Sequence, residues 1–112
     1  MKLHSLIYVS DKFKDIEITN EALMNGQMEE SLSKFARFIT IPKDSKEQLE
    51  IYSYSEFFLM KRYKREGLLV AITSSLSETD EYLKDVARKA YLGEKRHTIR
   101  EYVLESNKRG EL

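Results

Sequence analysis

Residues 49–74, LEIYSYSEFFLMKRYKREGLLVAITS, decide the fold. Hydrophobic and polar residues alternate over 49–54, and the segments 57–63 and 67–73 are rich in residues that favour β-strands. Gly67 follows a charged turn and can take a positive φ there. Three consecutive strands joined by short turns must be antiparallel, because a parallel pair needs a crossover of a dozen or more residues. The stretch therefore predicts an antiparallel meander.

The last strand of this meander contains the longest apolar run of the chain, LLVAI at 68–72. A strand with one face in water alternates between hydrophobic and polar residues, and this run does not. Two interpretations follow. Either the strand is central and the chain itself covers both faces, or a partner covers one of them.

The residues before the meander predict two strands and a long helix. Residues 3–9 predict a strand, and 13–18 predict a short second strand, with an extended loop as the alternative. From 21 to 39, hydrophobic residues recur at spacings of three and four, which predicts an amphipathic helix. Its apolar stripe consists of Met24, Met28, Leu32, Phe35, Ala36 and Ile39, with Leu23 and Phe38 beside it.

Two helices are predicted after the meander. Ser77 with Asp80 resembles a capping box, and the acidic residues of 78–81 suit the positive end of a helix dipole. This helix ends at Gly93, and Thr98 with Glu101 starts a last helix that ends near Gly110. The elements predict a single α+β domain over 1–112. Its antiparallel sheet has about five strands, with a long helix after the first two strands and two C-terminal helices.

Composition excludes several classes of protein. The 112 residues suit one domain, and the absence of cysteine excludes disulfides, thiol nucleophiles and thiolate zinc sites. Nineteen basic and nineteen acidic residues cancel, so bulk charge gives no reason to bind nucleic acid. No apolar run approaches the ~20 residues of a membrane helix, and the N-terminus lacks the apolar region of a signal peptide. We therefore expect a cytoplasmic protein without a membrane span.

Signals of catalysis are weak. His4 is interpreted as a strand histidine on a half-exposed face, and His97 as part of the turn before the last helix. No histidine or carboxylate pair has the spacing of a known metal site, and no G-x-S-x-G motif or phosphate-binding glycine loop occurs. We expect no enzyme activity, no catalytic residue, no cofactor and no metal. A small enzyme with an unrecognised pocket is the weakest of three hypotheses.

The order of elements resembles the roadblock/longin superfamily, whose small domains have a profilin-like sheet of about five strands. Three features carry the resemblance: the strands over 3–18 before a long helix, the segment NEALMNG at 20–26, and the meander followed by a helix that begins in an acidic turn. Archaeal members often show a similar acidic, apolar, small-residue stretch in the first helix. The extra helix from Ile99 favours the longin side.

The resemblance implies a non-enzymatic adaptor or scaffold. Members form homodimers or heterodimers through a helix and an edge strand, and many bind or regulate small GTPases or trafficking complexes. On the sequence itself, the wide apolar arc of the predicted first helix and two tyrosines on one strand face favour a protein interface. The candidate interface residues are Leu23, Met24, Met28, Phe35, Tyr52 and Tyr54. Core packing is the alternative for these side chains.

The second hypothesis is a small nucleic-acid-binding protein. Lys61, Arg62, Lys64 and Arg65 form a basic patch around Tyr63, and 84–109 contains eight basic and four acidic residues. Such a patch can follow a phosphate backbone, with the aromatic ring stacking on a base. The alternative interpretation is a hydrated hairpin tip and a solvated helix face.

Overall fold

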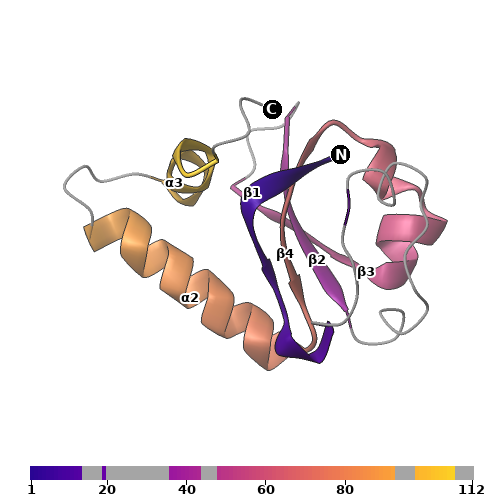
Figure 1. Ribbon diagram of the computed structural model, residues 1–112, viewed down its shortest axis with the longest axis horizontal. Helices are drawn as coiled ribbons and strands as arrows, with labels where there is room; N and C mark the ends of the chain where they lie inside the picture. Colours follow the sequence, from indigo (N-terminus) through magenta and orange to yellow (C-terminus); the bar gives the residue numbers. More distant parts are fainter. Residues whose placement is uncertain (14–18, 20–35, 44–47, 93–97, 108–112) are drawn as a thin grey trace.

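The computed structural model describes residues 1–13, 19, 36–43, 48–92 and 98–107. This part of the chain contains strands β1 (Lys2–Val9), β2 (Arg37–Pro42), β3 (Glu50–Ser53) and β4 (Gly67–Thr73), and helices α2 (Leu76–Leu92) and α3 (Ile99–Glu105). Short helical turns are η1 (Asp11–Phe13), η3 (Ser55–Leu59) and η4 (Arg62–Lys64). Helices α2 and α3 lie on one side of the sheet, and η3 and η4 lie on the other side (Figure 1).

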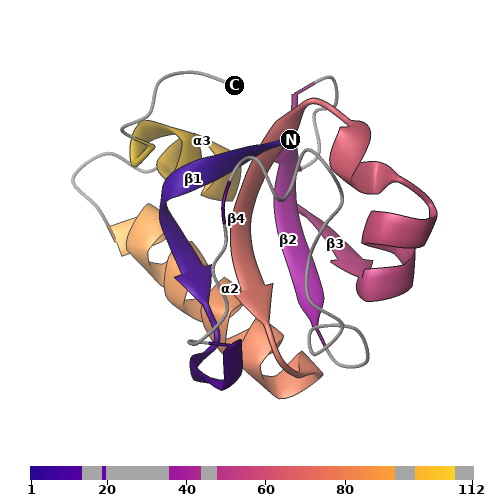
Figure 2. The same cartoon turned by 45° about the vertical axis from the view of Figure 1, so that its right-hand side comes forward.

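The described strands form one mixed sheet in the order β1-β4-β2-β3. β4 pairs in parallel with β1 and antiparallel with β2, and β2 pairs antiparallel with β3 (Figure 2). The prediction of an antiparallel five-stranded sheet is therefore wrong. The length rule behind it constrains only strands that follow each other closely, whereas β1 and β4 are separated by about half of the chain.

The predicted meander is also wrong, because 57–63 is not a strand. This segment belongs to the π-helical turn η3 and the 3-10 turn η4, and β2 lies between β3 and β4. In a strand, Phe57 and Phe58 would point to opposite faces. In the helical turn both rings are buried and contact Phe38 of β2, with ring centroids 4.4 Å and 5.5 Å from that of Phe38.

The end of the predicted first helix is a strand. Residues 37–39, which the periodicity assigned to the helix, belong to β2, and Phe38 and Ile39 are buried within the sheet. Over so few residues, hydrophobic periodicity does not distinguish a buried strand from the end of a buried helix. The predicted second strand over 13–18 does not begin at Phe13, which belongs to the helical turn η1, and its residues 14–18 lie outside the described residues. Residues 21–35 of the predicted helix also lie outside them, with Leu23, Met24, Met28 and Phe35.

The central position of β4 is confirmed, and the chain itself covers both of its faces. All seven residues of β4 are buried. Leu69 and Ile72 belong to the cluster that contains Phe38 and Phe57. Leu68, Val70 and Ala71 belong to a second cluster, which includes Val86 of α2 and Val103 of α3. The first of the two interpretations of the LLVAI run is therefore correct.

Both C-terminal helices are confirmed, with a correction at the start of α2. Its cap is Ser75 rather than Ser77, because the Glu78 N–H donates to Ser75 Oγ at 3.0 Å. The predicted capping box of Thr98 and Glu101 is present at the start of α3. This helix ends at Glu105, earlier than predicted. Among the described residues, no helix has the length and apolar character needed to cross a membrane.

Candidate functional site

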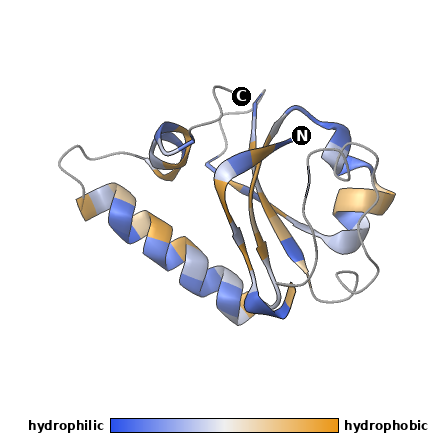
Figure 3. Cartoon of the chain, viewed as in Figure 1, coloured by the Kyte–Doolittle hydropathy of each residue, from blue (hydrophilic) through white to orange (hydrophobic). Residues whose placement is uncertain are grey.

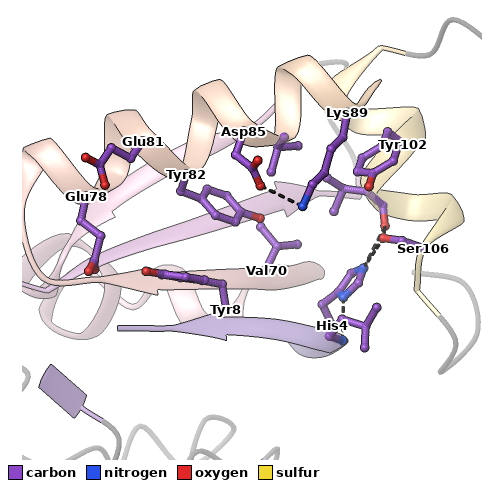
Figure 4. A pocket seen from close by; sticks show the side chains of 13 residues that line it. His4, Tyr8, Val70, Glu78, Glu81, Tyr82, Asp85, Lys89, Tyr102 and Ser106 are labelled. Carbon is purple, nitrogen blue, oxygen red and sulfur yellow. Dashed lines mark hydrogen bonds and ion pairs between the residues drawn. The ribbon is translucent and has the colours of Figure 1, made fainter. Parts of the chain in front are cut away.

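A pocket of about 390 Å³ opens between β1, β4, α2 and α3 (Figure 4). Val70 of β4, Val86 of α2 and Val103 of α3 give it an apolar lining. The polar lining comes from β1, from one face of α2 and from the end of α3. The pocket is thus assembled from four elements, of which β1 is far from the other three in the sequence.

A bulge in β1 places side chains at this pocket. Leu3 pairs with Leu69 and Tyr8 pairs with Ala71, so β1 advances by five residues where β4 advances by two. A bulge of this kind redirects the side chains within it. Leu6 and Tyr8 consequently line the pocket and keep 64% and 40% of their surface exposed.

His4 fastens the bulge to α3. The Leu6 N–H donates to Nδ1 at 2.9 Å, so Nδ1 is the acceptor and Nε2 carries the hydrogen. Nε2 in turn lies 2.9 Å from the carbonyl oxygen of Val103 and 3.1 Å from Ser106 Oγ. His4 is only 4% exposed. The expectation of a half-exposed face is therefore wrong, because α3 covers the ring.

Glu78 joins the end of β1 to the start of α2. Its carboxylate accepts hydrogen bonds from the Ser74 N–H at 2.8 Å and from Ser10 Oγ at 3.1 Å. These contacts agree with the sequence interpretation of Glu78 as a group that supports the helix start.

The other two carboxylates of the pocket, Asp85 and Glu81, differ in whether they are paired with a cation. Asp85 binds Lys89 and Arg88, each at 2.9 Å, and these hydrogen bonds lower the pKa of Asp85. The bond to Asp85 raises the pKa of Lys89. Glu81 is exposed and makes no hydrogen bond or ion pair with the described residues. Glu81 is thus the carboxylate that remains available to a ligand.

Tyrosines form the middle of the pocket. The rings of Tyr8 and Tyr82 have centroids 5.5 Å apart and are tilted by 40°. Burial raises the pKa of Tyr82 to about 12, with smaller effects from Tyr102 and Asp85. Burial and then the charge of Glu78 raise the pKa of Tyr8. Both phenols therefore stay protonated at neutral pH and offer ring surface and hydrogen bonds rather than a base.

The charges of the pocket favour a cationic ligand. Three carboxylates and one ammonium group line it, and one of those carboxylates is unpaired. No group of three histidine or acidic side chains in the described part of the chain could hold a metal ion. The arrangement suits an apolar group that lies next to a positive charge.

The structure turns the two described candidate interface residues toward the core. Tyr52 and Tyr54 are both half-buried. The Tyr54 ring centroid lies 4.9 Å from that of Phe58, and the Tyr52 ring centroid lies 6.4 Å from that of Phe57. Both tyrosines thus pack against the aromatic cluster on the sheet, as the alternative of core packing predicts. The other four candidates lie outside the described residues.

The four residues of the predicted basic patch lie in and beside η4, but Arg65 is already paired with other residues of the chain. Arg65 lies 3.3 Å from Glu50 and 3.1 Å from the Tyr52 hydroxyl. Lys61, Arg62 and Lys64 make no ion pair with any residue that the structure describes.

The aromatic ring of this patch points inward. Tyr63 packs on Phe58, with centroids 5.7 Å apart, and does not present its ring to a base. In the second basic segment, Arg88 and Lys89 both bind Asp85. Arg100 donates to the carbonyl oxygen of Pro42 at 2.7 Å.

Sequence reasoning missed the pocket. It predicted a helix for the region of Tyr82 and a strand for the region of Leu6 and Tyr8, without bringing the two together. The only local signal is that His4, Leu6 and Tyr8 occupy alternate positions of β1, which places them on one face of a strand. Comparisons with protein-family models, with characterised proteins and with solved structures gave no match.

Proposed function

We propose that this chain is a non-enzymatic adaptor domain that binds a partner protein through the pocket between β1 and α2. One observation carries the proposal. Most polar groups of the pocket are engaged in bonds within the chain, and the exposed residues of its lining are Leu6, Tyr8, Glu81 and Lys89, of which Lys89 is paired with Asp85.

These bonds favour binding over catalysis. A general base needs an available lone pair within reach of the substrate. The Nδ1 lone pair of His4 accepts from the backbone, Glu78 supports the start of α2, and Asp85 is paired with two cations. Glu81 is the one lining carboxylate without such a bond to the described residues, so a catalytic site here would have a single exposed base with no engaged partner beside it. Apolar and tyrosine surface beside a pocket is typical of protein-binding sites.

The acidic and apolar lining of the pocket indicates which side chains a partner segment would carry. An apolar side chain would fill the space above Val70, against Leu6 and Tyr8, and a neighbouring lysine or arginine would lie against Glu81. The partner segment is therefore expected to carry an apolar residue next to a basic one.

The wider proposal includes the predictions made from the sequence. A homodimer, a small GTPase or trafficking complex as partner, a cytoplasmic location and kinship with the roadblock/longin superfamily all rest on the resemblance of element order, and one of its three features, the meander, is not present in the structure. Fold resemblance alone does not fix function. The nucleic-acid alternative has less support, because Tyr63 and Arg65 are both engaged within the chain.

An array of random 12-residue peptides tests the proposal. We expect the bound peptides to share an apolar residue beside lysine or arginine. Replacing Leu6 with aspartate should weaken their binding at least tenfold, because it puts a charge on the apolar wall. Leu92→Asp, at an exposed site on the far end of α2, is the matched control and should bind normally. Peptides whose binding is unchanged by Leu6→Asp would contradict the proposal, and so would an array without bound peptides.

A further inference from the structure

A second surface, independent of the pocket, lies on the other side of the sheet. We call residues 59–64, LMKRYK, the basic tip. It follows the buried part of η3 and includes η4. Leu59 and Met60 are 74% and 60% exposed, although both are apolar. Figure 3 shows this hydrophobic turn beside a hydrophilic one, at the end of the molecule away from α2 and α3.

The fold holds the two apolar side chains outward. Phe57 and Phe58 are buried in the aromatic cluster, so the residues that follow them in the turn point to solvent. Met60 N–H donates to the Ser55 carbonyl oxygen at 3.0 Å and Lys61 N–H to the Phe58 carbonyl oxygen at 3.2 Å. Lys61 has a φ of 56°, in the left-handed region, which ends the turn sharply. Exposure of Leu59 and Met60 is therefore a consequence of ordered structure.

The tip also carries an excess of positive charge. Lys61, Arg62 and Lys64 make no ion pair with the described residues. The neighbouring carboxylates are engaged elsewhere: Glu66 lies 3.4 Å from Lys43, and Glu50 lies 3.3 Å from Arg65. The tip thus contains two exposed apolar side chains, followed in the chain by three cations that make no ion pair with the described residues.

Exposed apolar side chains next to cations favour one kind of anionic partner, a lipid bilayer, over another, a nucleic acid. A single-stranded nucleic acid gains most from aromatic rings that stack on its bases, and the ring of Tyr63 is turned into the core. Leu59 and Met60 would gain nothing from a phosphate backbone. An anionic bilayer favours both features, because its surface attracts lysine and arginine and its interface accepts apolar side chains. We propose that the basic tip docks the domain on the surface of an anionic phospholipid bilayer, with Leu59 and Met60 in the interface.

Such docking is weak and reversible. Each cation near an anionic surface strengthens binding roughly fivefold, so three of them give roughly a hundredfold preference for anionic over neutral lipid. The attraction falls as salt screens it. Two apolar side chains add a contribution that salt does not remove.

Vesicle flotation with the full chain tests the proposal. The vesicles contain either phosphatidylcholine alone or phosphatidylcholine with phosphatidylserine in a 7:3 ratio, at low and high salt. One variant carries Lys61→Asn, Arg62→Gln and Lys64→Gln, where asparagine is chosen because it tolerates a left-handed backbone. A second carries Leu59→Ser and Met60→Ser. The matched control carries Leu76→Ser and Leu92→Ser, which remove two other exposed leucines.

We expect binding to the phosphatidylserine vesicles only, with a loss of at least tenfold in each tip variant and none in the control. Thermal unfolding of each variant verifies that it is folded. No binding to phosphatidylserine vesicles overturns the proposal. Binding that survives the serine substitutions also overturns it, because the tip would then be a general anion-binding patch. If a single-stranded DNA oligonucleotide binds and competes with the vesicles equally in wild type and serine variant, nucleic acid is the occupant.

Discussion

Replacing Gly67 with alanine tests the order of the sheet on which the pocket depends. Gly67 pairs with Pro42 where β4 runs beside β2. A Cβ at this position would lie 2.4 Å from the carbonyl oxygen of Ile41, and 3.3 Å from two further backbone atoms. The contact is with backbone, which cannot rotate away as a side chain would. The strands must therefore separate locally to accept alanine.

The magnitude follows from two opposing effects. Overpacking of a tight site typically costs 1–3 kcal/mol, whereas alanine stabilises by restricting the unfolded chain, so the net loss is about 1–2 kcal/mol. For a domain of 112 residues this loss lowers the melting temperature by roughly 4–9 °C. It also lowers the urea midpoint by roughly 1 M at an unchanged slope.

Urea unfolding followed by circular dichroism measures this loss. Glu66→Ala is the matched control, because it changes the preceding residue and removes only an exposed ion pair with Lys43. We expect the control to stay within about 0.5 kcal/mol of wild type. If Gly67→Ala is as stable as wild type, β4 does not lie against Ile41, and both the sheet order and the pocket built on it are refuted.

Two further predictions concern hydroxyl groups. Thr73 Oγ1 lies 2.6 Å from Thr79 Oγ1, which also donates to the Ser75 carbonyl oxygen, so Thr73 depends on Thr79 as its acceptor. Thr79→Val should therefore cost about 1–3 kcal/mol in urea unfolding and Thr73→Val less, with the double variant more stable than Thr79→Val alone; equal costs for the single variants would contradict this direction. Tyr82 has a pKa of about 12 in the folded chain against 10 for the free side chain, so the folded state holds the proton more tightly. The resulting stabilisation is complete below pH 10 and is lost as the pH rises toward 12. Tyr82→Phe should remove the last tyrosinate signal in an ultraviolet titration, and an unchanged titration would refute the assignment.

The sequence predicted the features that local chemistry determines. The threonine cap of α3, the helix α2 with its acidic start and the buried run of β4 each depend on residues close together in the chain. Capping and periodicity report such features directly.

The features that the sequence did not predict depend on contacts between distant segments. FFLMKRY favours a strand by composition, but packing of Phe57 and Phe58 on Phe38 holds it as helical turns. The parallel pairing of β1 with β4 has no local signal. The pocket requires that pairing, a bulge in β1 and the His4 contact to α3, so no single segment reveals it.

The most direct test of the account is an NMR titration of the ¹⁵N-labelled chain with the tightest peptide from the array. The account predicts shift changes at the amides of Tyr8, Glu81, Tyr82 and Lys89, which line the pocket, and loss of these changes in the Leu6→Asp variant. Shift changes that instead concentrate on β3 and η3, around Tyr52 and Tyr54, would contradict it, because the partner would then bind the opposite face of the sheet.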